Sequence, residues 1–141
     1  QRRTHRIANQ LIAGGLTPQA VGAVLSPNDI DAFSCILGIL RGGGAWMPLN
    51  ARNAVDDNIA ILQDNECRFL FYHSAFAEAA EQIRAQVTSL LGLVCIDRPN
   101  GDDPEFGSWL ATASEEACYV PALPTDIASI WPSGGTTGRS K

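Results

Sequence analysis

Basic charge is scarce in this sequence, and its only lysine is the last residue, Lys141. Charged residues make up 18% of the chain, and ten basic against fifteen acidic side chains give a net charge of −5. Because a nucleic-acid-binding surface normally carries excess basic charge, this composition argues against a nucleic-acid partner. Apolar runs of about 18 residues, which a transmembrane helix needs, are absent, and no apolar leader follows the basic N-terminus.

Closely spaced cysteine pairs are also missing. The four cysteines, Cys35, Cys67, Cys95 and Cys118, are widely separated, whereas zinc sites use closer ligand pairs. We interpret them as reduced, buried thiols of a cytoplasmic protein. With 141 residues, 45% of them apolar, the chain has the size of one globular domain and needs no disulfide to hold its core.

Short apolar runs alternate with amphipathic segments along the chain. The runs are expected to form strands near residues 20–25, 45–49, 68–72, 93–96 and 127–131. Helices are expected over residues 6–13, 29–41, 53–62, 75–91 and 106–113. Strands that alternate with helices indicate an α/β fold with a mostly parallel sheet flanked by helices.

Details of two of these helices are also predicted. Asn28 or Asp29 is expected to cap the second helix, whose apolar face would carry Ile30, Phe33, Leu37 and Leu40 at three- and four-residue spacing. Asn53 is expected to cap the third helix.

A glycine-rich segment follows the last expected strand, where ligands of parallel sheets usually bind. Residues 133–141 read Ser-Gly-Gly-Thr-Thr-Gly-Arg-Ser-Lys. Glycines allow backbone N–H groups to approach an anion, hydroxyls donate to phosphate oxygens, and Lys141 adds a cation. The P-loop NTPase pattern is not met, because Arg139 follows Gly138. A glycine-rich turn without a ligand is the alternative, and Trp131 is expected to brace the loop.

This segment resembles the phosphate-binding signature T-S-G-T-T-G-x-P-K of the AMP-forming adenylating enzymes, which include acyl-CoA synthetases, adenylation domains of peptide synthetases and luciferases. Gly134 stands at the usual serine and Ser140 at the usual proline. Residues 11–28, 40–50 and 59–68 are similar to further family motifs, in the same order. In the first of these, Gln19 or Ala20 stands where the family has a glycine before the strand.

The resemblance implies that residues 1–141 form the first part of the large N-terminal domain of an adenylate-forming enzyme, with no second domain in this chain. The family activates a carboxylic acid, here expected to be a fatty acid, with ATP and Mg²⁺, and then transfers the acyl group to CoA. The implied ATP-phosphate site comprises Ser133, Gly134, Gly135, Thr136, Thr137, Gly138 and Lys141. Catalytic residues and metal ligands are expected outside this chain.

Two alternatives stay open. The first is an adenylation domain that loads a carrier protein, although Asn50 favours the CoA-dependent branch, because peptide-synthetase domains more often have aspartate there. The second is a non-catalytic α/β module that binds a nucleotide or a partner. As part of a larger domain, the isolated chain is expected to be inactive and to expose apolar surface, and therefore either to self-associate, for example as a homo-oligomer, or to be poorly stable.

Overall fold

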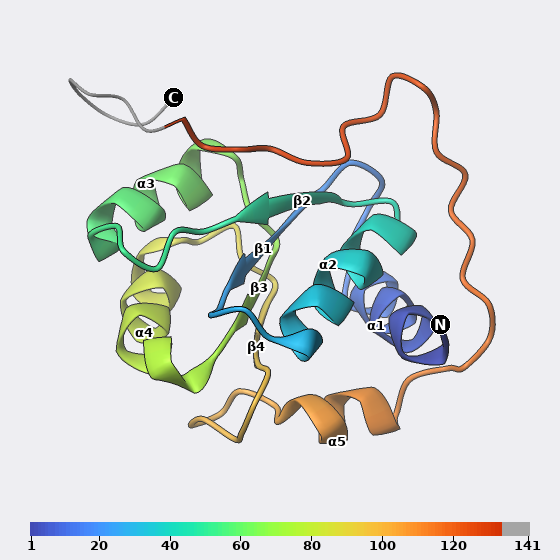
Figure 1. The fold of residues 1–141 in the computed structure, drawn as a ribbon, viewed down its shortest axis with the longest axis horizontal. Helices are drawn as coiled ribbons and strands as arrows, with labels where there is room; N and C mark the ends of the chain where they lie inside the picture. Colours follow the sequence, from blue (N-terminus) through green and yellow to red (C-terminus); the bar gives the residue numbers. More distant parts are fainter. Residues whose placement is uncertain (134–141) are drawn as a thin grey trace.

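A parallel β-sheet organises the fold in the computed structural model, which describes residues 1–133 (Figure 1). Its strands are β1 (Val21–Leu25), β2 (Ala45–Pro48), β3 (Phe69–Tyr72) and β4 (Gly92–Cys95). The strand order is β2-β1-β3-β4, and β1 pairs with β2 and β3 while β3 pairs with β4, all in parallel. The predicted α/β fold with a mostly parallel sheet is confirmed.

Helices cover both faces of the sheet (Figure 1). They are α1 (Arg2–Ala13), α2 (Ile30–Arg41), α3 (Val55–Asp64), α4 (Ala77–Gln86) and the short α5 (Phe106–Ala111). One core cluster joins α1, α2 and α5 to the sheet, and the other joins α3 and α4 to its opposite face. In β1, Ala23 and Leu25 belong to the α3–α4 side and Val24 to the other, as alternation along a strand requires.

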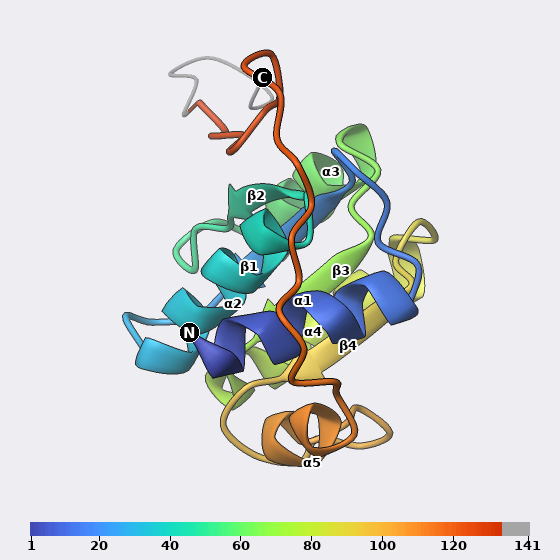
Figure 2. The same cartoon turned by 90° about the vertical axis from the view of Figure 1, so that its right-hand side faces the viewer.

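The chain returns from α5 across α1 toward β2 (Figures 1 and 2). The side-chain amide of Asn9 on α1 donates to the backbone carbonyl oxygens of Ser114 and Glu116, at 2.9 and 3.0 Å. The His5 ring accepts a hydrogen bond from the Cys118 amide at 3.0 Å. This return brings the C-terminal segment from one side of the molecule to the open edge of β2.

The predicted apolar face of α2 is wrong. Its expected members are exposed: Ile30 to 77%, Phe33 to 59%, Leu37 to 39% and Leu40 to 36%. The face that is buried instead carries Ala32, Cys35, Gly38 and Ile39.

Close packing explains this orientation of α2. A Cβ at Gly38 would lie 2.2 Å from the Ile7 side chain of α1, and a Cβ at Gly22 of β1 would lie 2.8 Å from Ile39. Only the small-residue face of the helix fits at such distances. Periodicity could not distinguish the two faces because both are apolar.

Some predicted helix boundaries also differ. The first helix starts at Arg2, four residues before its predicted start at Arg6. The helix predicted over 75–91 is a short 3-10 turn followed by α4, which ends at Gln86. Beyond it, the Leu91 amide already donates to the Arg68 carbonyl, at 2.7 Å, on the way into β4.

The two predicted caps have different outcomes. Asp29 caps α2, because its carboxylate accepts hydrogen bonds from the amides of Asp31 and Ala32 at 2.6 and 3.3 Å. Asn53 does not cap α3, which begins after Ala54 without a side-chain cap. Its side chain donates instead to the buried Asn58 at 3.2 Å.

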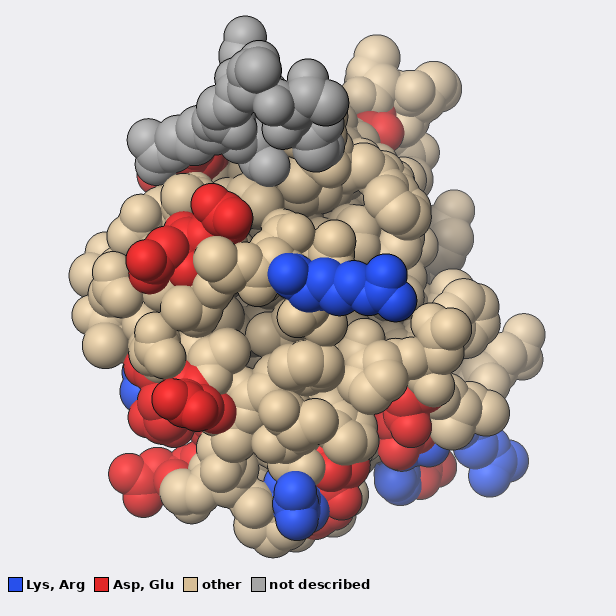
Figure 3. All heavy atoms as spheres, turned by 60° about the vertical axis from the view of Figure 1, so that its left-hand side comes forward, with Lys and Arg blue, Asp and Glu red and all other residues tan. Residues whose placement is uncertain are grey.

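Charges of both signs occur on the surface. On the face shown in Figure 3, acidic side chains gather in several groups, one basic side chain lies among uncharged residues near the middle, and most other basic side chains lie near acidic ones toward the lower edge. Among residues 1–133, no helix is long and apolar enough to cross a membrane.

Candidate functional site

The carboxyl ends of the strands lie at one edge of the sheet because all the strands are parallel. The chain leaves β1 toward α2 on one face and leaves β3 toward α4 on the other. Neighbouring strands whose connections diverge in this way mark the usual ligand-binding edge of such sheets. Four loops begin at this edge, at Ser26, Leu49, His73 and Ile96.

The segment of residues 127–132, here the approach segment, runs parallel to β2 and leads to this edge. The Trp46 amide of β2 donates to the Ala128 carbonyl, and the Ile130 amide donates to the Trp46 carbonyl, both at 2.9 Å. These bonds make one parallel bridge between Trp46 and Ser129. The strand predicted over 127–131 is therefore reduced to a single bridge in the described residues, but its predicted direction is confirmed.

Two tryptophans fix the end of the approach segment. The rings of Trp131 and Trp46 meet edge-on, with centroids 5.2 Å apart and planes at 83°, a favourable geometry for aromatic pairs. The Trp131 indole N–H also donates to the Ser129 hydroxyl at 3.1 Å. Trp131 thus connects the end of the approach segment to β2. Beyond Ser133, the loop that it is expected to brace lies outside the described residues.

A hollow of about 450 Å³ opens beside Trp131 at the ends of β1 and β2. Its walls are mainly apolar, and two lining residues, Ser26 and Trp46, each have a buried polar atom without a hydrogen-bond partner among residues 1–133. The lining residues include Val24, Pro27, Phe33, Ile36, Pro48 and Leu49. The approach segment therefore ends next to a mainly apolar hollow at the carboxyl ends of β1 and β2.

Of the predicted phosphate-site residues, the structure describes only Ser133, which is exposed. Gly134, Gly135, Thr136, Thr137, Gly138 and Lys141 lie outside the described residues. Their assignment to a phosphate site stays a prediction.

A second polar group at this edge was missed by the sequence analysis. The Asp97 carboxylate, after β4, accepts hydrogen bonds from the Ser74 amide and hydroxyl, after β3, at 2.7 and 2.6 Å. The His73 ring lies 3.5 Å from the same carboxylate, and its Nδ1 accepts from the Ala75 amide at 3.1 Å. Polar residues directly after two strands were the available signal.

Hydrogen bonding determines the acidity of Asp97. Partial burial raises the pKa of this carboxyl group, but the hydrogen bonds from Ser74 outweigh burial, and the net pKa lies below its usual value. The carboxylate therefore stays charged at neutral pH and joins the loops after β3 and β4.

We expect the Asp97→Asn substitution to destabilise the chain by about 1 kcal/mol at pH 7, the worth of a typical hydrogen bond. Because the folded-state pKa is lowered, the carboxylate stabilises the fold above its unfolded-state pKa, and this contribution is lost as pH falls through the folded-state value. Urea unfolding of the wild type and of Asp97→Asn at pH 7 and near pH 3 measures this contribution. The free energies of unfolding of the two proteins should become equal at the lower pH. Asp102→Asn, at an exposed position, is the control, and a pH-independent difference for Asp97→Asn would contradict this account.

A largely buried hydrogen-bond network connects the loop after β4 to β3 and α4. The Tyr72 hydroxyl, fully buried, donates to the Asp103 carboxylate at 2.6 Å, and Arg84 of α4 donates to both Asp103 oxygens at 2.5 Å. The side-chain amide of Asn100 donates to the Tyr72 hydroxyl oxygen at 2.7 Å. Burial, reinforced by Asp103, raises the pKa of Tyr72. These groups are paired with one another, so they organise the loop.

The thiols are unpaired, as expected. Cys35, Cys67 and Cys95 are buried, while Cys118 is half-buried. Burial raises the pKa of Cys35 and Cys95, and that of Cys67 to about 12. These three thiols are therefore protonated and poor nucleophiles at neutral pH. Among residues 1–133, no group of three or more His, Cys, Asp or Glu side chains could hold a metal ion.

Comparison with known proteins connects this geometry to a family. The family model described as AMP-binding enzyme matches residues 1–141. The chain is 28% identical to the crotonobetaine/carnitine–CoA ligase of Citrobacter koseri and 31% identical to the 3-hydroxybenzoate–CoA ligase of Aromatoleum, in both cases over 97% of its length. It spans only 28% and 26% of those proteins. It is also 25% identical, over 99% of its length, to a linear gramicidin synthase of Brevibacillus parabrevis, of which it spans 2%.

Solved structures show the same fold. An anthranilate CoA ligase in complex with anthranoyl-AMP superposes with a TM-score of 0.92 at 23% identity, covering 99% of this chain and 27% of that one. ATP-bound MatB from Rhodopseudomonas palustris superposes with a TM-score of 0.81 at 26% identity, with the same coverage. The sheet and its helices thus match about a quarter of each of these longer enzymes.

Proposed function

We propose, since this chain belongs to the AMP-binding enzyme family, that it is the N-terminal part of an AMP-forming acid–CoA ligase. The enzyme would join a carboxylic acid to AMP with release of pyrophosphate and then transfer the acyl group to the thiol of CoA. The direction of the approach segment carries the proposal, because this segment runs parallel to β2 and directly precedes residues 133–141 in the sequence. ATP is bound at the carboxyl edge of many parallel sheets.

The loop would act on the departing pyrophosphate. When a carboxylate oxygen attacks the α-phosphorus, the bond to the β-phosphate oxygen breaks and negative charge moves onto the leaving group. Backbone N–H groups of Gly134, Gly135 and Gly138 and the hydroxyls of Thr136 and Thr137 would donate to it. The Lys141 ammonium would neutralise part of its charge, together with the Mg²⁺ that accompanies ATP.

The identities of the carboxylic acid and of the acceptor of the acyl group are further parts of this proposal. CoA ligases among the relatives favour CoA as the acceptor, and Asn50 agrees with that branch. The gramicidin synthase relative favours the second candidate, an adenylation domain that loads a carrier protein. A reducing, cytoplasmic location is part of the proposal, supported by the unpaired thiols.

Product analysis tests the proposal. We expect the full-length protein that contains this chain to form acyl-CoA, AMP and pyrophosphate from ATP, Mg²⁺, CoA and one member of an acid panel. The panel should include fatty acids, 3-hydroxybenzoate, anthranilate and carnitine, and mass spectrometry would identify the thioester. Adenylate without acyl-CoA would reject the CoA ligase in favour of carrier loading. ADP and phosphate as products would reject both.

A further inference from the structure

Gln19, in the turn before β1, has an unfavourable backbone conformation. Its φ is 66°, in the left-handed region that suits glycine and strains residues with a Cβ. In the described part of the chain, Glu66 is the only other non-glycine residue with a positive φ. Of the two residues at the position of the family glycine, the strain therefore falls on Gln19.

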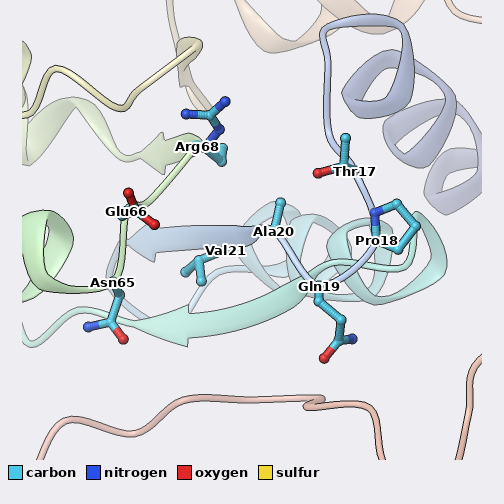
Figure 4. A pocket seen from close by; sticks show the side chains of 8 residues that line it. All are labelled: Thr17, Pro18, Gln19, Ala20, Val21, Asn65, Glu66 and Arg68. Atoms are coloured by element: carbon cyan, nitrogen blue, oxygen red, sulfur yellow. The ribbon is translucent and has the colours of Figure 1, made fainter.

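The Gln19 side chain contacts the approach segment. Its carboxamide oxygen accepts a hydrogen bond from the Ile127 amide at 2.7 Å, and its nitrogen donates to the Ile127 carbonyl at 3.5 Å. Figure 4 shows Gln19 at the rim of the hollow that Thr17 and Arg68 also line, with its side chain extending toward the C-terminal segment. The carboxamide thus pairs with both backbone groups of Ile127, as a neighbouring strand would.

This contact extends the pairing of the approach segment. The backbone of Trp46 forms hydrogen bonds with Ala128 and Ile130. Gln19 holds Ile127, the residue that directly precedes them. The backbone amide of Gln19 also donates to the Gly43 carbonyl at 2.7 Å. This hydrogen bond fixes the turn that carries the Gln19 side chain. A glycine at this position would relieve the strain but could not make the side-chain contact.

We propose that Gln19 is a positioning residue for the phosphate-binding loop. Its carboxamide fixes the start of the approach segment, six residues before Ser133, and the strained backbone is retained because it aims the side chain at Ile127. This inference rests on the proposed function, since it requires that residues 133–141 bind ATP.

Two substitutions separate this role from general stability. Gln19→Gly removes both strain and contact, so the urea midpoint should equal or exceed that of the wild type. The Ile127 amide should nevertheless exchange with solvent roughly threefold to tenfold faster, as expected for the loss of one hydrogen bond. Gln19→Asn keeps the carboxamide but is one methylene too short, and should have the same effect on exchange. Glu66→Gly, which relieves a similar strain at φ 47°, is the control and should leave Ile127 unchanged.

Kinetics of the full-length protein then test the link to ATP. Gln19→Gly should raise the KM for ATP threefold to tenfold in acid-dependent pyrophosphate release, with kcat changed less than twofold, because loop placement and not chemistry is altered. Unchanged Ile127 exchange, or faster exchange with an unchanged KM, would overturn the proposal. Lys141→Ala distinguishes failure of the positioning role from failure of the proposed function. If it impairs ATP use while Gln19→Gly does not, only the positioning role is rejected, and if neither has an effect, the proposed function fails too.

Discussion

Replacing Lys141 with alanine in the full-length protein should lower kcat/KM for ATP by roughly tenfold to a hundredfold. One charge-assisted contact is worth about 1.5–3 kcal/mol, and it would be lost from the departing pyrophosphate. Acid-dependent pyrophosphate release over a range of ATP concentrations measures the effect.

The neighbouring cation provides a matched control. Arg139 occupies the variable position of the resembled signature, so Arg139→Ala should change kcat/KM for ATP less than twofold. Equal losses for the two variants would point to a general effect of positive charge on ATP attraction. Wild-type rates for Lys141→Ala would remove this lysine from the site.

Replacing Asp103 with alanine should have the largest effect on stability, about 2–3 kcal/mol. The Asp103 side chain is only 4% exposed and accepts hydrogen bonds from Tyr72 and Arg84. Its removal leaves the Tyr72 hydroxyl without its acceptor in the core, while Arg84, 39% exposed, can return partly to water. Urea unfolding of the 141-residue chain at neutral pH would measure the loss.

The adjacent residue controls for the change in net charge. Asp102 is exposed, so Asp102→Ala should change the free energy of unfolding by less than about 0.5 kcal/mol. Tyr72→Phe should recover part of the loss when added to Asp103→Ala, because it removes the stranded hydroxyl. Additive effects of the two substitutions would show that they do not share one network.

The positions and the parallel direction of the strands could be predicted, because buried parallel strands are short apolar runs separated by helices. Their order in the sheet was not predicted. The inward face of α2 could not be predicted, since the apolar side chains Phe33 and Leu37 are exposed and Gly38 is buried. That choice depends on the close approach of Ile7, a contact between helices that no local pattern encodes.

The site was predictable only in part. The glycine-rich composition of residues 133–141 identified the candidate loop, and the apolar run at 127–131 identified the direction of approach. The contact of Gln19 with Ile127 joins residues 108 positions apart, and the pairing of Asp97 with Ser74 joins the ends of two strands. Such contacts depend on tertiary structure, although the missing glycine before β1 was a visible signal.

Exchange of labelled pyrophosphate into ATP tests the central claim most directly, because it reports formation of the acyl adenylate without any thiol acceptor. The full-length protein, supplied with ATP, Mg²⁺ and its carboxylic acid but no CoA, should incorporate label into ATP only when the acid is present. The 141-residue chain alone should not, because a single phosphate-binding loop does not orient the acid against the α-phosphate. Absence of acid-dependent exchange in the full-length protein across the whole acid panel would contradict the account.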